Sequence, residues 1–83
     1  MRFIKIGDSY FNPMRIEQIE SSIEVDYGKY KPIVVVHLTE RAVNYDAMDL
    51  GFCLLEFNER WEALGFADAM VAKVVSLIEE ALT

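Results

Sequence analysis

The chain has 83 residues, with 14 acidic and 8 basic side chains, a formal net charge of −6 and one cysteine. We expect a single domain over residues 1–83, whose small core is marginal without a staple or a partner. One cysteine excludes an intramolecular disulfide and a multi-cysteine metal site, and it favours a reducing, cytoplasmic location. The acidic balance argues against direct binding of nucleic acid and favours a protein partner with a basic surface. Because no apolar run is long enough for a signal peptide or a membrane helix, we expect no membrane contact.

Two short β-prone segments open the chain, at residues 2–6 and 9–12, and the turn signal Gly7-Asp8-Ser9 separates them. They predict a first hairpin. Asn12-Pro13 ends it, because proline and the residue before it both favour turns. The residues that follow can form one tight helical turn.

Residues 19–25 alternate between apolar and polar side chains, which predicts a half-buried strand with Ile19, Ile23 and Val25 facing the core. The acids of this region form a row with no base between its ends: Glu17, Glu20, Glu24 and Asp26. The row is a candidate binding surface for a basic partner. Charge rows on strands are usually only solvated faces, which also protect a sheet edge from aggregation.

Four aromatic residues are further candidates for an interface, where tyrosine and tryptophan are favoured anchors. They are Tyr27, Tyr30, Tyr45 and Trp61. The two nearest to the acidic row, Tyr27 and Tyr30, are assigned to the same partner-binding surface. All four also fit ordinary core or rim positions.

The apolar run at residues 33–38 is rich in β-branched side chains and predicts the central strand of the sheet. Residues 42–46 are a plausible antiparallel return strand. Residues 47–57 are ambiguous, since Phe52–Phe57 fits either another strand or the start of a helix. Gly28 is expected to supply a positive φ in the loop before the central strand.

Helical spacing without glycine or proline predicts a helix over residues 67–82. A shorter helical segment is expected before it, capped by Asn58 and ended or kinked at Gly65. The apolar stripe of the long helix is wider than one sheet face can cover. Its candidate self-association residues are Val71, Val75, Ile78 and Leu82.

Two accounts of this wide stripe remain open, and we favour the first. A twofold dimer can bury the stripe, because one patch then serves both subunits. Alternatively, residues 52–66 can fold over the helix and cover it within the monomer.

Reactive side chains are few. His37 is the only histidine and lies in an apolar strand, where a hydrogen bond to a neighbour or to solvent is the simplest role. Cys53 is expected to be a buried structural cysteine, because nothing in its spacing suggests a nucleophile. We therefore expect no catalytic residue, no metal site and no cofactor.

The opening stretch from Phe3 to Pro13, followed by Ile16, Ile19 and Glu20, resembles the start of many small phage, prophage and bacterial β-sheet-plus-helix proteins. The resemblance covers about the first third of the chain and is structural. It implies a protein that is not an enzyme, and some such acidic phage proteins, anti-CRISPRs among them, occupy the nucleic-acid-binding surface of a host protein.

The expected fold is therefore α+β, with an antiparallel sheet of four to five strands and a C-terminal helix packed on one face. The expected function is a protein-binding module that inhibits or modulates a basic host or bacterial protein. A structural or regulatory homodimer is the alternative.

Overall fold

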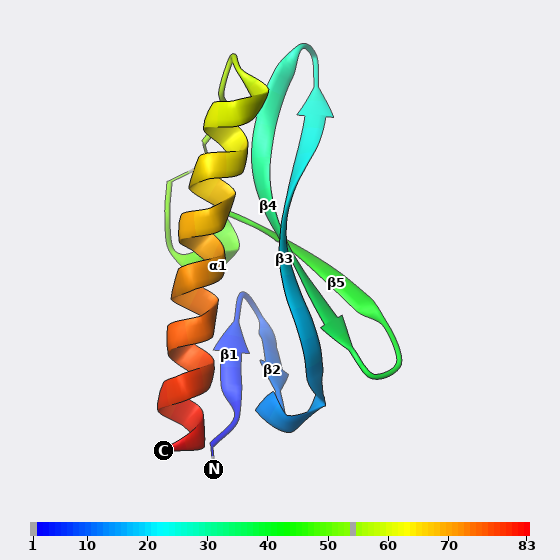
Figure 1. Cartoon of the computed structure of the whole chain (residues 1–83), viewed down its shortest axis with the longest axis vertical. Helices are drawn as coiled ribbons and strands as arrows, with labels where there is room; N and C mark the ends of the chain where they lie inside the picture. Colours follow the sequence, from blue (N-terminus) through cyan, green and yellow to red (C-terminus); the bar gives the residue numbers. More distant parts are fainter. Residues whose placement is uncertain (1, 54) are drawn as a thin grey trace.

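The computed structural model describes residues 2–53 and 55–83 as two antiparallel sheets and one long helix (Figure 1). In chain order the elements are β1 (Ile4–Ile6), β2 (Ser9–Phe11), the 3₁₀ turn η1 (Pro13–Arg15), β3 (Ile16–Asp26), β4 (Lys29–Leu38), β5 (Ala42–Asp46), the 3₁₀ turn η2 (Met48–Leu50) and α1 (Arg60–Leu82). The predicted α+β class is confirmed.

The prediction of one sheet of four to five strands is wrong. β1 and β2 form a two-stranded sheet, and β3, β4 and β5 form a separate three-stranded sheet in that order. The break lies at η1, which turns the chain between β2 and β3 so that these two strands do not pair. The Asn12 side chain stabilises η1 by accepting a hydrogen bond of 3.0 Å from the backbone N–H of Met14. The first hairpin and the tight turn are thus confirmed, while their sheet is not continuous with the next.

β3 and β4 form a long hairpin that closes with a two-residue turn at Tyr27-Gly28, where φ is 49° and 74°. Two positive φ values give the turn a twist that matches the flanking strands, and the expected role of Gly28 is confirmed. β5 pairs with the other edge of β4, so the apolar run at residues 33–38 is the central strand, as predicted.

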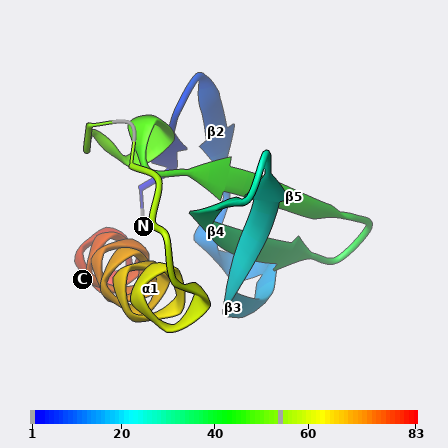
Figure 2. The same ribbon diagram turned by 90° about the horizontal axis from the view of Figure 1, so that it is seen from above.

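The helix α1 packs against one face of the β3–β4 hairpin, and the two run side by side along the molecule (Figures 1 and 2). The buried residues of α1 are Ala63, Ala67, Met70, Val74 and Ala81. Met70, Val74 and Ala81 belong to one core cluster with the fully buried Val34 and Val36 of β4. Tyr45 and the buried side chains of β1 and β2 complete this cluster.

One continuous helix replaces the two that the sequence predicts. α1 starts at Arg60 and passes through Gly65, which neither ends nor kinks it. The expected Asn58 cap is also wrong, because Glu59 is the N-cap residue and its side chain makes no capping hydrogen bond. Asn58 instead accepts a hydrogen bond from the Lys29 ammonium, which joins the start of α1 to the tip of the hairpin.

The described residues of the ambiguous stretch, 47–53 and 55–57, form neither a long strand nor an α-helix. After η2 they run beside α1, where the Phe52 and Phe66 rings pack edge to face with centroids 5.2 Å apart. The Lys73 ammonium donates a hydrogen bond of 2.7 Å to the carbonyl of Leu50 and lies 4.7 Å from the Phe52 ring centroid. The segment therefore covers one flank of the helix.

Two burial predictions are wrong. Val25 points to the face expected from the alternation, but it is 62% exposed because it lies at the end of β3, next to the turn. Cys53 is exposed in the segment beside α1 and is not a core residue. Ile19 and Ile23 are half-buried, while Glu20 and Glu24 are exposed as predicted.

Two valines on the β3–β4 hairpin give a matched test of the core. Val34 is fully buried, so Val34→Ala should lower the free energy of unfolding by about 1.5–3 kcal/mol through lost burial and a residual cavity. Val25→Ala should change it by less than about 0.5 kcal/mol, as expected for an exposed site. Urea denaturation of both variants measures the difference, and equal losses would contradict the packing described here.

Gly65 gives a test of the continuous helix. Its Cβ position has no heavy atom within 4 Å, so Gly65→Ala should stabilise the protein by about 0.5–1 kcal/mol, the usual gain of alanine over glycine inside a helix. Gly51 is the control, because its φ of 86° makes Gly51→Ala destabilising by about 1–2 kcal/mol. Thermal melts of both variants check this. A destabilising effect of Gly65→Ala would support the kinked or interrupted helix that the sequence predicts.

Candidate functional site

An open groove lies between the C-terminal half of α1 and the first half of β3. It has a volume of about 370 Å³ and is lined by Pro13, Ile16, Glu17, Gln18, Ile19, Val75, Ile78 and Leu82. Most of these side chains are apolar, and they come from η1, β3 and α1, of which α1 is far from the other two in the sequence. Leu82 is 49% and Val75 37% exposed, so the groove presents apolar surface that the core leaves uncovered.

The groove lies beside an unpaired strand edge. β3 pairs only with β4. Apart from the N–H of Ile16, which donates to the carbonyl of Pro13 in η1, no backbone group of β3 bonds to another segment among the described residues. On the far side of β4, Tyr30 exchanges both backbone hydrogen bonds with Phe57, at 2.8 Å each. Since alternate residues of an antiparallel strand point to opposite edges, the partners of Tyr30, Val34 and Val36 on β3 direct their backbone groups away from the sheet.

The residues with these outward backbone groups follow from the register of the hairpin: Val25 opposite Tyr30, Ser21 opposite Val34, and Ile19 opposite Val36. Ile23 belongs to the same series because it faces Pro32. The side chains of this series face α1, as the hydrogen bond from the Ser21 hydroxyl to the Asp68 carboxylate shows. The free edge and the helix flank thus meet along one line.

The acidic row lies on β3 as predicted, but β4 supplies bases opposite to it. Glu20 lies 2.7 Å from the imidazole Nε2 of His37, and Asp26 lies 3.4 Å from the Lys31 ammonium. The hydrogen bond with Asp26 raises the pKa of Lys31. Glu17 and Glu24 form no ion pair with a described residue. Lys31 lies across from Glu24 in the register, so of these two carboxylates only Glu17 has no described base opposite to it.

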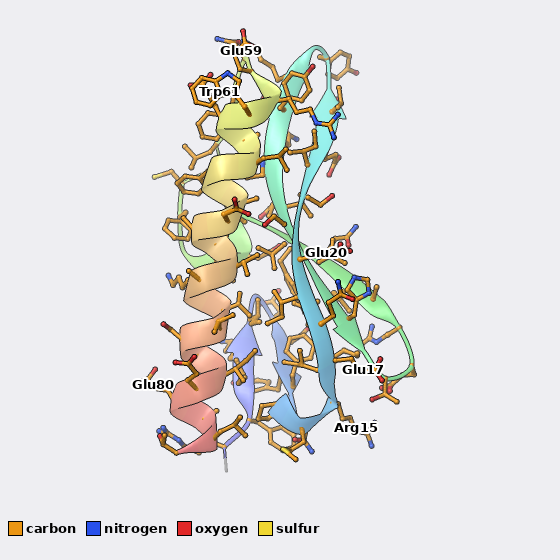
Figure 3. All side chains as sticks on the ribbon, viewed as in Figure 1. Arg15, Glu17, Glu20, Glu59, Trp61 and Glu80 are labelled. Atoms are coloured by element: carbon orange, nitrogen blue, oxygen red, sulfur yellow. The ribbon has the colours of Figure 1, made fainter. Side chains whose placement is uncertain are left out.

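Figure 3 shows Glu17 and Glu20 on the same half of β3, whereas Trp61 and Glu59 lie at the far end of the molecule. The partner-binding residues predicted from the sequence therefore extend along the whole strand and do not form one cluster. Tyr27 is 97% exposed at the tip of the hairpin. Tyr30 is half-buried beside Phe57, and Tyr45 is a core residue whose burial raises the pKa of its phenol.

Three of the four predicted self-association residues line the groove, namely Val75, Ile78 and Leu82. The fourth, Val71, is half-buried and packs against the core. The two accounts of the wide apolar stripe each describe one flank of α1. Residues 47–53 and 55–57 cover the flank that carries Phe66 and Lys73, whereas the flank beside β3 stays open. Whether a second copy covers it remains a prediction.

The sequence reasoning missed the contribution of β3 to this groove. The alternation assigns Ile19 to the core, and Asn12-Pro13 indicates only a turn. Hydrophobic periodicity shows which face of a strand is buried. It does not show how far across that face the helix extends, so no signal in the sequence placed these side chains at an open border.

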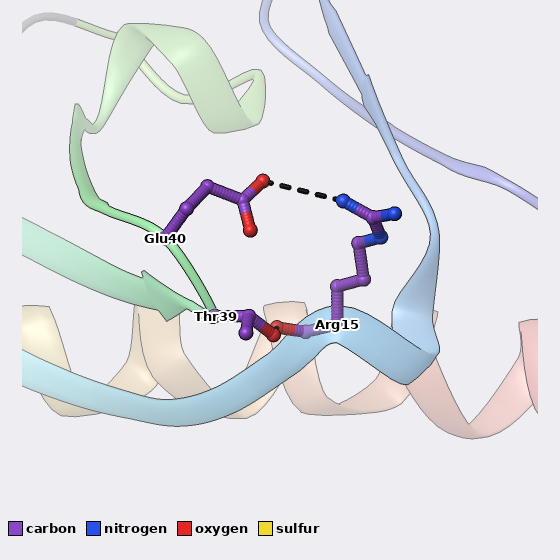
Figure 4. Close-up of polar contacts among 3 residues, drawn as sticks. All are labelled: Arg15, Thr39 and Glu40. Atoms are coloured by element: carbon purple, nitrogen blue, oxygen red, sulfur yellow. Dashed lines mark hydrogen bonds and ion pairs between the residues drawn. The ribbon is translucent and has the colours of Figure 1, made fainter.

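A second hollow, of about 310 Å³, is lined by Phe3, Tyr10, Phe11, Asn12, Arg15, Leu38, Glu40 and Arg41. Arg15 lies 3.4 Å from Glu40, and the backbone N–H of Thr39 donates a hydrogen bond of 3.1 Å to the carbonyl of Arg15 (Figure 4). These contacts fix the β4–β5 turn against η1. Arg15 is therefore engaged within the chain, and the hollow is a weaker candidate than the groove.

The reactive side chains do not converge. His37 bonds to Glu20, in agreement with the expected strand histidine, and Cys53 lies exposed on another segment. In the part of the chain that the structure describes, no group of three or more histidine, cysteine or acidic side chains could hold a metal ion.

The groove remains the main candidate site after comparison with known proteins. The chain matches no family model, and no curated protein or solved structure is significantly similar to it. No helix within residues 2–53 and 55–83 is both long and apolar enough to cross a membrane.

Two neighbouring valines test the openness of the groove. Val75→Glu should keep the fold with a loss of less than about 1 kcal/mol, since the new carboxylate can reach water. Val74 is fully buried, so Val74→Glu should cost more than about 4 kcal/mol and unfold the chain, because it buries an unpaired charge. Circular dichroism and urea titration distinguish these outcomes, and unfolding of both variants would show that the groove is closed.

Proposed function

We propose that this chain is a non-enzymatic protein-binding module that takes up a basic surface of a partner protein along the α1–β3 border. The observation that carries the proposal is the open groove, which joins apolar side chains of η1, β3 and α1 to the carboxylate of Glu17 at its rim. Interfaces gain their affinity from such apolar centres, while charges around them select the partner.

Electrostatics support a basic partner. The chain has a formal net charge of −6, and Glu17 and Glu24 of β3 lack a described ion-pair partner. α1 carries four acids and two bases within its bounds, which adds to the negative field beside the groove. Such a field speeds encounter with a basic surface and is screened by salt over about 8 Å at physiological ionic strength.

The resemblance of the opening residues to small phage and prophage proteins suggests where the partner acts. An inhibitor of this class would work in the bacterial cytoplasm and occupy the nucleic-acid-binding surface of a host protein. The groove and the acidic strand fit that role, because a surface that binds phosphates is rich in lysine and arginine.

A homodimer is the second candidate function, and the apolar character of Val75, Ile78 and Leu82 favours it. A second copy can bury the same residues twice about a twofold axis. The dimer predicts a doubled mass in light scattering at micromolar concentration, reverting to the monomer mass in Val75→Glu.

Affinity capture with two matched variants tests the proposed function. The bait is the chain on beads in a bacterial lysate at low salt, compared with Val75→Glu in the groove and Ala72→Glu on the exposed side of α1. Both variants add one negative charge, but only the first changes the groove. We expect a basic protein on the wild type and on Ala72→Glu, but not on Val75→Glu, and we expect about 0.5 M salt to elute it because the Debye length then falls to a few ångströms.

Two further variants separate charge from packing in this capture. Glu17→Gln with Glu24→Gln should weaken retention of the basic protein, since these carboxylates lack partners within the described chain. Capture that is equal for the wild type and Val75→Glu, or that persists unchanged at high salt, would refute the proposed surface.

A further inference from the structure

We infer that the partner binds by adding an extended segment to the free edge of β3, antiparallel to it, with alternate apolar and basic side chains. This inference rests on the proposed function and specifies its geometry. Between Ile19 and Val25 the edge of β3 offers a row of backbone hydrogen-bonding groups that no described residue satisfies. A peptide that adds a strand gains affinity from those main-chain bonds, and its alternate side chains give specificity.

The groove lies where the inward side chains of such a segment would go. An added strand runs about 4.8 Å outside β3, and its residues opposite Ile19 and Ser21 face the same way as these two, toward α1. The flank of α1 at that point carries Val75, Ile78 and Leu82, which line the groove together with Ile16 and Ile19. The inward positions of the segment therefore accept aliphatic side chains.

The outward positions face the acidic side of the hairpin. Residues of the segment beside Glu20 and Glu24 would point away from α1, because these two residues alternate with Ile19, Ser21 and Ile23 along β3. A lysine or arginine at such a position meets Glu24, or Glu17 at the bulge where the β3–β4 register shifts between Ile16 and Gln18. Opposite charges across neighbouring strands are favourable by about 0.2–1 kcal/mol per pair.

A second copy of β3 is a poorer occupant of this edge. Its outward face would bring Glu20, Glu24 and Asp26 against the same acids of the first copy. In every twofold antiparallel register centred between Glu20 and Asp26, carboxylates of the two copies stand directly or diagonally opposite one another. Like charges so placed are destabilising, and each copy carries a formal charge of −6. Charge therefore selects a basic segment over self-pairing.

A synthetic probe tests the inference without knowledge of the natural partner. The probe is a short, fluorescently labelled peptide in which lysine and valine alternate, and fluorescence anisotropy reports its binding to the full chain at low salt. We expect binding by the wild type, loss of binding in Val75→Glu, and no binding of the matched peptide with glutamate in place of lysine.

Methylation of the peptide backbone tests strand addition directly and leaves the protein unchanged. In an antiparallel pair the inward valines direct their N–H groups to β3, so N-methylation of the valines should weaken binding at least about tenfold, the effect of one unmade buried hydrogen bond. N-methylation of the lysines should change affinity less than about threefold, because those N–H groups face solvent. Equal effects of the two methylations would overturn strand addition.

The matching protein variants are Ser21→Pro and Ser21→Ala. Both remove the hydroxyl that bonds Asp68, but only proline removes the backbone N–H that faces the free edge, where proline is tolerated. We expect Ser21→Pro to bind the lysine–valine peptide about tenfold more weakly than Ser21→Ala, with circular dichroism confirming that both fold. Equal binding by the two variants would overturn the inference.

The outcomes separate this inference from the proposed function. Peptide binding that Val75→Glu abolishes, but that neither methylation nor Ser21→Pro affects selectively, leaves the basic-partner module standing and refutes strand addition alone. A failure of both the lysine–valine peptide and the lysate proteins to bind refutes both. If the chain binds a second copy of itself more tightly than it binds the lysine–valine peptide, the second copy and not a basic segment occupies the edge of β3.

Discussion

The structure depends on the close packing of α1 against the β3–β4 hairpin. Three of the five buried residues of α1 are alanines, Ala63, Ala67 and Ala81, and side chains this small let the helix backbone approach the strands. Met70 and Val74 fill the space between them, opposite the fully buried Val34 and Val36. This contact is stabilised mainly by the hydrophobic effect, because each Å² of apolar area removed from water contributes about 25 cal/mol to the free energy of folding.

The placement of the helix determines which surfaces remain open. One flank of α1 is covered by residues 47–53 and 55–57, held by the Lys73–Leu50 hydrogen bond and the Phe52–Phe66 contact. The other flank borders β3, the edge strand of the three-stranded sheet. An exposed edge strand can pair with another chain and aggregate, and natural proteins prevent this with charged side chains on the edge. Glu17, Glu20 and Glu24 provide that charge here, so the same residues that keep copies apart can select a basic partner.

Much of the fold was predictable because local patterns determine it. The alternation at residues 19–25, the branched run at 33–38 and the turn at Gly28 gave the hairpin and its central strand. Predictions failed where distant contacts decide. Gly65 stays helical because the packing of the buried Ala63 and Ala67 around it outweighs its low helix propensity. Asn58 accepts a hydrogen bond from Lys29 and does not cap the helix. Val25 is exposed because it lies at the end of β3, next to the turn.

The candidate site was predictable only in part. The width of the apolar stripe indicated that Val75, Ile78 and Leu82 exceed what one sheet face covers, and the acidic row lies on the strand beside them. The sequence did not show that β4 sets His37 and Lys31 against Glu20 and Asp26, since cross-strand partners depend on the register. Nor did it show that the groove and the free edge coincide.

The open edge of β3 is the central claim, and amide hydrogen exchange of the free chain, followed by NMR, tests it most directly. Backbone amides that bond to β4 should exchange slowly, whereas those facing the free edge should exchange fast. The expected pattern is an alternation, with slow exchange at Glu20, Ser22 and Glu24 and fast exchange at Ile19, Ser21 and Ile23. Uniform protection of both sets at micromolar concentration would contradict the account, because it would mean that another segment or a second copy already covers this edge.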